Sequence, residues 1–159
     1  MNQVQQTFAE ISKNLIGQKV SAIKLGVGSF LTLDFGQLHT KLTKTKTGKE
    51  LIHTFGEWHL WVYMCAWRID KNGKPYIASS DDRTKIAQII KELFDTVLTK
   101  WELLNPSLDT KWYFDDHITL TLFNTSTEDE DQWLLFTPED MVLTIGPGDT
   151  WTYQPSGAN

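Results

Sequence analysis

The stretch that decides the fold of this chain is GEWHLWVYMCAWRID, residues 56–70. In an extended strand, side chains alternate between two faces, so the even-numbered residues from Trp58 to Ala66 face one side and the odd-numbered residues from Glu57 to Trp67 face the other. Both faces are largely apolar, which is typical of a strand covered on both sides or meeting a partner on one side. The stretch exceeds the usual strand of about five or six residues, which predicts a bulge or bend between Met64 and Ala66.

Helical periodicity appears in two segments. Apolar residues recur at helical spacing between Val4 and Leu15, and Gly17 follows where a helix C-terminus favours glycine, which predicts a helix over 3–16. Ser80 or Asp81 can cap a second helix, whose apolar stripe runs from Ile86 to Leu93.

The remaining chain has the alternation and turn signals of strands. Asp34-Phe35-Gly36 closes one strand, and Asn72-Gly73 predicts a tight hairpin because both positions favour positive φ. Lysine-rich residues 43–50, TKTKTGKE, are expected to form an exposed hairpin end. Strands are predicted at 19–25, 30–35, 38–42, 57–69, 76–78, 96–103, 111–114, 117–123, 132–137, 141–145 and 150–153.

The order of these elements repeats, since each half of the chain has one helix followed by five or six strands. Trp58 aligns with Trp133 and Phe35 with Phe114, at offsets of about 75 to 79 residues, and length differences fall in loops, where insertions cost little. The predicted fold class is α+β, with two pseudo-symmetric, mostly antiparallel repeats, residues 1–79 and 80–159, that share one aromatic-rich core in a single compact domain. Such repeats should pack about a pseudo-twofold axis.

Composition places the chain among globular proteins, since 40% of its 159 residues are hydrophobic and 22% are charged. The N-terminal residues MNQVQQTFAE lack a basic and an apolar signal region, and no apolar run reaches the roughly eighteen residues of a membrane span. Cys65 is the single cysteine, which excludes an internal disulfide. These features predict a cytoplasmic protein with no membrane contact, and no cofactor motif is found.

Charge is distributed unequally between the two halves. Residues 1–79 carry ten Lys and Arg and five Asp and Glu, whereas residues 80–159 carry five Lys and Arg and fifteen Asp and Glu. Such a distribution bears on partners and association rates rather than on the fold. The acidic half disfavours nucleic-acid binding, because phosphates would be repelled.

Three groups of residues are candidates for a functional site. His53, Glu57 and His59 are ligand types that zinc accepts, although their spacing matches no zinc motif and polar positions at a strand edge explain them equally. Trp61, Tyr63 and Trp67 share one strand face and would form an aromatic patch if no helix covers it. The acidic candidates for partner binding are Asp115, Asp116, Glu128, Asp129, Glu130 and Asp131.

The segments GEWHLW, CAWRI and IASSDD resemble those of small uncharacterised bacterial proteins of the immunity type, which are encoded beside polymorphic toxins. The resemblance implies a cytoplasmic protein that binds and blocks a toxin, and it implies no catalytic residue. Independently, a carboxylate-rich face can dock a basic protein and raise the association rate. The leading hypothesis is therefore a non-enzymatic binding protein that docks a basic partner through its acidic half. Two alternatives remain: a small metal-dependent or small-molecule enzyme using His53, Glu57 and His59, and a module that self-associates into a homo-oligomer.

Overall fold

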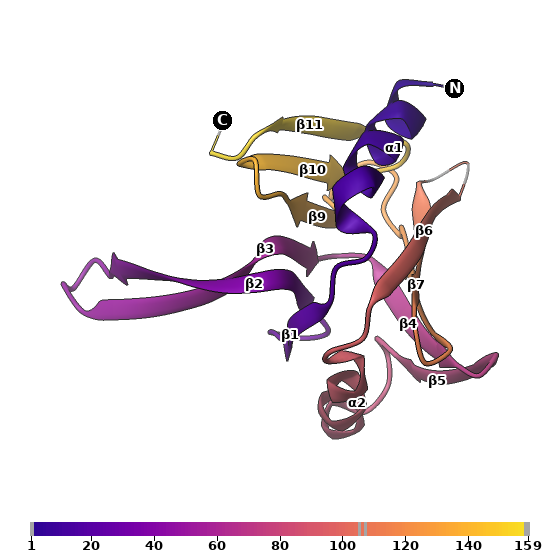
Figure 1. Cartoon of the computed structure of the whole chain (residues 1–159), viewed down its shortest axis with the longest axis horizontal. Helices are drawn as coiled ribbons and strands as arrows, with labels where there is room; N and C mark the ends of the chain where they lie inside the picture. Colours follow the sequence, from indigo (N-terminus) through magenta and orange to yellow (C-terminus); the bar gives the residue numbers. More distant parts are fainter. Residues whose placement is uncertain (1, 105, 107, 158–159) are drawn as a thin grey trace.

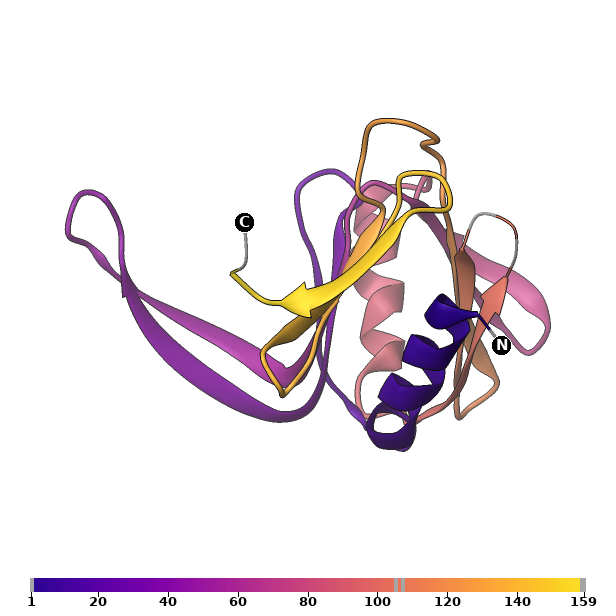
Figure 2. The same ribbon diagram turned by 90° about the horizontal axis from the view of Figure 1, so that it is seen from above.

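The computed structural model describes residues 2–104, 106 and 108–157. It is an α+β fold made mostly of strands, which form two antiparallel sheets of six and five strands. The helices α1 (Gln3–Leu15) and α2 (Arg83–Ile89) lie between the sheets at opposite ends, as Figures 1 and 2 show. The predicted α+β class and antiparallel strands are confirmed, and no helix among the described residues is long and apolar enough to cross a membrane.

Helix α1 forms where the sequence predicts it. The Asn2 side chain accepts from the Gln5 N–H and the Gln5 side chain accepts from the Asn2 N–H, so two N–H groups that the helix itself leaves free are bonded. Its apolar stripe is buried between the sheets: Phe8 stacks on Trp101 of one sheet at 4.2 Å and meets Trp133 of the other edge-on at 6.3 Å. The helix therefore joins the two sheets into one core.

The six-stranded sheet has the order β1-β2-β3-β9-β10-β11. In the body of the sheet, buried side chains alternate with partly exposed ones along β3 and β9, and no helix of the described chain covers the outer face in Figure 2. Its strands are β1 (Val20–Leu25), β2 (Leu31–Lys44), β3 (Glu50–Val62), β9 (Trp133–Phe136), β10 (Met141–Ile145) and β11 (Trp151–Pro155).

The five-stranded sheet has the order β5-β4-β8-β7-β6, and the short 3-10 helix η1 (Ile90–Leu93) leads into it from α2. Asn72 and Gly73, with φ of 54° and 74°, form the predicted tight turn between β4 and β5. Its strands are β4 (Ala66–Lys71), β5 (Lys74–Ala78), β6 (Leu98–Leu104), β7 (Asp109–Phe114) and β8 (Ile118–Phe123).

The long strand expected over 57–69 is divided between the two sheets. β3 ends at Val62, the chain bends at 63–65 as predicted, and β4 begins in the other sheet at Ala66. The bend reverses the faces, so Trp67 points into the core and is only 2% exposed. The expectation that Trp67 belongs to an outward aromatic patch is therefore wrong.

Cys65 lies buried in this bend. Burial raises the pKa of its thiol to about 12 from an ordinary 9.0. Between these pH values the unfolded chain loses a proton that the folded chain keeps, so the thiol's contribution to stability is complete below pH 9 and is lost as the pH rises towards 12. From pH 8 to pH 10.5, the unfolding free energy measured in urea should fall by about 2 kcal/mol more in the wild type than in Cys65→Ala. Equal pH dependence in the two proteins would contradict this burial.

The segments that follow the two helices run antiparallel beside each other and exchange backbone hydrogen bonds. The Gly17 N–H donates to the Leu98 carbonyl oxygen at 2.8 Å, and the Asp95 N–H donates to the Val20 carbonyl oxygen at 2.8 Å. Gly17 and Asp95 both have positive φ, 96° and 66°. The first strand pair of each half, β1–β2 or β6–β7, then begins alike, because Val20 opposite Phe35 and Leu98 opposite Phe114 each precede a bulge.

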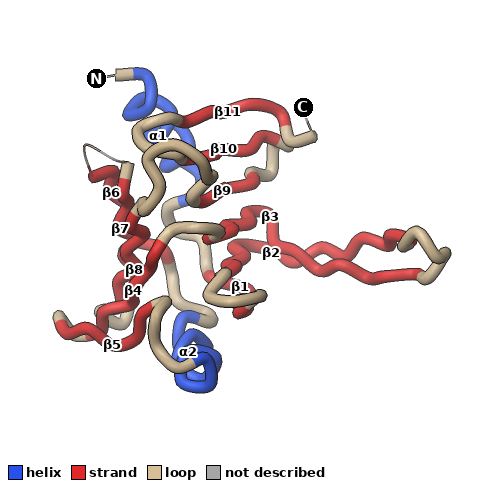
Figure 3. Tube along the Cα trace, turned by 180° about the vertical axis from the view of Figure 1, so that it is seen from behind, coloured by secondary structure: helices blue, strands red, loops and turns tan. Residues whose placement is uncertain are grey.

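The β2–β3 hairpin extends far beyond its own sheet. β1 pairs with β2 only from Leu31 to Phe35, and β9 pairs with β3 only from His59 to Val62. Residues 38–56, here called the arm, therefore have only each other as strand partners among the described residues. The arm projects from the body in Figure 3, and a hairpin with no third strand is only marginally stable in water.

Candidate functional site

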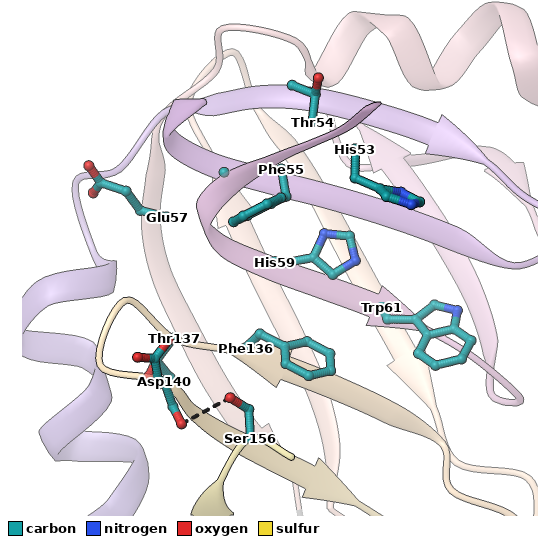
Figure 4. Close-up of a pocket in the computed structure, with 11 residues that line it drawn as sticks. His53, Thr54, Phe55, Glu57, His59, Trp61, Phe136, Thr137, Asp140 and Ser156 are labelled. Carbon is teal, nitrogen blue, oxygen red and sulfur yellow. Dashed lines mark hydrogen bonds between the residues drawn. The ribbon is translucent and has the colours of Figure 1, made fainter. Parts of the chain in front are cut away.

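A groove of about 500 Å³ lies at the base of the arm (Figure 4). One wall comes from β3 of the arm and the other from the end of β9, the β9–β10 turn and the C-terminal segment. The residues that line it are His53, Thr54, Phe55, Gly56, Glu57, His59, Trp61, Phe136, Thr137, Asp140 and Ser156.

The groove follows the edge of β3 rather than one of its faces. Five consecutive residues, 53–57, line it, although their side chains alternate between the two faces of the strand. β9 occupies this edge of β3 only from His59 onward, so in the described part of the chain no strand pairs with the edge at 50–57. The groove therefore lies where a further strand could pair with β3.

A buried carboxylate holds the floor of the groove in place. Asp34 on β2 is 2% exposed, and its Oδ1 lies 2.8 Å from His59 Nδ1 and accepts the Gly56 N–H at 2.8 Å. A Cβ on Gly56 would lie 2.7 Å from the Phe35 carbonyl oxygen, so only glycine allows the two strands to approach this closely. Asp34 thereby fixes both the His59 ring and the point where the arm leaves the sheet.

Aromatic rings surround the fixed imidazole. His59 lies 5.9 Å from the Phe136 ring, and its side chain is 31% exposed towards the groove. When Nδ1 of neutral His59 carries the proton bonded to Asp34, Nε2 is free to accept a hydrogen bond from a bound group. The charged lining residues are Asp140 and Glu57, whose carboxylate is turned away from the imidazoles (Figure 4), and no lysine or arginine is among the described lining residues. The groove therefore suits an apolar or basic segment that supplies donors.

The structure brings His53, Glu57 and His59 to the same groove but does not assemble them as metal ligands. The two imidazoles face the groove, whereas the Glu57 carboxylate points away from both (Figure 4). No group of three or more His, Cys, Asp or Glu side chains in the described ranges is placed to hold a metal ion.

The six acidic residues predicted to bind a partner lie in two separate parts of the structure. Asp115 and Asp116 form the β7–β8 turn, where the Asp115 carboxylate accepts the Val97 N–H at 3.0 Å. Residues 128–131 lie beyond the other end of β8, roughly 20 Å away along a six-residue strand. The two groups of acidic residues therefore lie at opposite ends of β8.

The loop that carries Glu128–Asp131 is held by its own polar residues. The Ser126 hydroxyl accepts the N–H groups of Asp129 and Glu130, and the Gly148 N–H donates to the Ser126 carbonyl oxygen at 2.8 Å. This hydrogen bond brings Asp149, which follows Gly148 in the sequence and is also exposed, close to the loop. The loop presents a fixed acidic surface away from the turn at 115–116.

Trp61 and Tyr63 remain on the outer face of the six-stranded sheet, while Trp67 has joined the core. Their rings lie 4.7 Å apart, and Phe30 packs on Tyr63 at 4.9 Å. The aromatic patch therefore consists of Trp61, Tyr63 and Phe30, each partly exposed. Sequence alternation identified the first two, but no local signal links Phe30 to them.

Two groove residues had no signal in the sequence strong enough to identify them. Asp34 was expected to close a strand, and its bond to His59 depends on the register that pairs the two residues across β2 and β3. Phe136 comes from the second half of the chain and reaches His59 only because β9 pairs with β3. Comparison of the chain with family models, with curated proteins and with solved structures gives no match.

Proposed function

We propose that this protein is a non-enzymatic binding protein that takes up an extended, basic segment of a partner along the open edge of β3. The observation that carries the proposal is the groove lined by the consecutive residues 53–57, beside a strand edge with no strand partner in the described part of the chain. An extended segment that adds to a sheet edge gains affinity from main-chain hydrogen bonds and specificity from side-chain pockets.

The charges and rings of the groove support a basic segment. The charged lining residues, Glu57 and Asp140, are both acidic, and Trp61 and Phe136 offer aromatic faces on which a lysine or arginine side chain can lie. His59 is held by Asp34, and in the tautomer whose Nδ1 donates to that carboxylate its Nε2 provides an acceptor.

The acidic loop 128–131 enters the proposal as a second contact for the same basic partner. Its carboxylates are exposed. Electrostatic attraction between exposed carboxylates and an approaching basic partner raises the association rate more than the affinity. If the resemblance to immunity proteins extends to function, the partner is a basic toxin. Asp115 and Asp116 are left out, since they lie at the other end of β8 and serve the turn there.

The test uses short capped peptides that alternate lysine with valine, titrated into the full chain and followed by NMR. We expect the lysine peptide to shift the amide signals of residues 53–57 and a glutamate–valine peptide of equal length not to do so. Salt should weaken the binding, because the charged lining residues are accessible to solvent. Equal binding of both peptides, or shifts confined to residues outside the groove, would count against the proposal.

Backbone pairing is tested with the same lysine peptide methylated on alternate backbone nitrogens. Methyl groups on one set of positions should abolish binding, and on the other set they should leave it intact, because only one side of an added strand pairs with β3. An equal loss of binding with both methylated peptides would show that the groove recognises the peptide through its side chains alone.

We also infer that the chain arose from a duplicated helix-and-strand unit. The strand order supports this, because each sheet joins three consecutive strands of one half, β1–β3 or β6–β8, to strands of the other half. The exchanged hydrogen bonds of Gly17 and Asp95 support it as well. In this correspondence Trp133, the first residue of β9, matches Trp67, the second residue of β4, because β9 and β4 are each the fourth strand of their half; the sequence alignment had paired Trp133 with Trp58.

A further inference from the structure

We propose that the segment which occupies the open edge of β3 is β3 of a second copy of this chain, paired antiparallel about a twofold axis at His53. The inference rests on the proposed strand-binding function and names its occupant. The partner is a second copy because the edge is complementary to itself in apolar content and in charge.

The open edge of β3 lacks the features with which proteins protect exposed strands. Residues 51–55, LIHTF, are all exposed and contain neither lysine nor proline, and Ile52 is 72% exposed. By contrast, the β2 strand of the arm carries Lys41 and Lys44, which discourage edge pairing. Of the two strands of the arm, only β3 is suited to receive another strand.

Antiparallel pairing of residues 51–55 with themselves gives a matched set of neighbours. With His53 opposite His53 of the second copy, Leu51 lies opposite Phe55 and Ile52 opposite Thr54. An aromatic residue facing an aliphatic one is a favourable cross-strand pair. Leu51 and Phe55 are each more than a third exposed here. In the dimer, Leu51 of each copy packs against Phe55 of the other, so this contact forms twice, once on either side of the axis.

Charge complementarity supports the same register. The end of the arm carries Lys44, Lys46 and Lys49 against Glu50, so it is basic. Because the two strands run in opposite directions, the lysine-rich end of each arm reaches the base of the other. That base holds Glu57 and the β9–β10 turn with Glu139 and Asp140. Each basic arm end thus meets acidic residues of the second copy, and twofold symmetry repeats this contact.

The first test measures the mass of the full chain by sedimentation and light scattering between about 1 and 100 µM, the range expected for a small interface. We expect a monomer–dimer equilibrium that weakens as salt rises. Ile52→Lys should raise the dissociation constant at least about tenfold, because it places a charge on the paired edge. Val27→Lys is the matched control, since Val27 is 82% exposed but lies outside the arm, and it should leave the equilibrium unchanged.

The second test examines the register with engineered thiols. The native Cys65 is buried, so a cysteine at position 53 is the only exposed thiol. Mild oxidation of His53→Cys should give a covalent dimer, because directly opposed residues of an antiparallel pair lie about 4.5 to 5.5 Å apart between Cα atoms. Val27→Cys should give no covalent dimer under the same conditions.

A wild-type chain that remains monomeric at 100 µM overturns the inference, as does equal cross-linking at positions 53 and 27. These outcomes are separable from failure of the proposed function. If the chain is monomeric but the lysine–valine peptide still shifts residues 53–57, only the second copy is excluded as the occupant. If neither binds there, both proposals fall.

Discussion

Replacing Trp112 with alanine should lower the free energy of unfolding by about 3–5 kcal/mol, the largest loss expected for any single side chain. Trp112 is fully buried in β7 and contacts rings from both sheets: Trp101 at 5.0 Å, Trp133 at 5.8 Å and Phe35 at 6.3 Å. Its indole N–H donates to the Thr110 hydroxyl at 2.9 Å. The variant loses these contacts and leaves a cavity that rigid strands on either side cannot fill.

The measurement is urea unfolding followed by circular dichroism, because removal of a tryptophan alters the fluorescence itself. Trp61→Ala is the matched control, since Trp61 lies partly exposed on the outer face, and its loss should be at most about 1 kcal/mol. Similar losses for the two variants would show that the ring cluster between the sheets does not dominate the core.

Replacing Asp34 with alanine should cost about 2–4 kcal/mol and should loosen the base of the arm. The change leaves the Gly56 N–H and the His59 Nδ1 without their acceptor, and a buried polar group without a partner costs roughly 1–3 kcal/mol. Because Asp34 is almost fully buried, water cannot readily replace the lost carboxylate.

Asp34→Asn is the matched control, since the amide keeps the size of the carboxylate and one acceptor oxygen. It should lose less stability than the alanine variant, and the His59 ring should remain ordered in NMR spectra. Faster amide exchange at residues 51–57 in Asp34→Ala would show that this carboxylate holds the arm to the body. A loss below about 0.5 kcal/mol, or unchanged exchange, would contradict that role.

The groove at the base of the arm is formed by residues from both halves of the chain. The arm comes from the basic first half, while Phe136, Thr137 and Asp140 come from the acidic second half. The charged residues that the two halves contribute to the groove, Glu57 and Asp140, are both acidic.

Several elements could be predicted from local pattern because the physical cause is itself local. Helix α1 follows from its apolar spacing and cap, and the turn at Asn72-Gly73 follows from the preference of both residues for positive φ. The bend between Met64 and Ala66 follows from the length of the apolar stretch. In each case the residues that interact lie within a few positions of one another.

The groove depends on contacts between residues far apart in the sequence, and local pattern carries no information about them. The bend at 63–65 sends β4 to the second sheet, which turns Trp67 inward and leaves Trp61 outward. Pairing of β3 with β9 stops at His59, so the edge before it stays open. Strand alternation determines which side chains share a face, but only the register between distant strands decides which faces are covered, because that register is set by packing of the whole core.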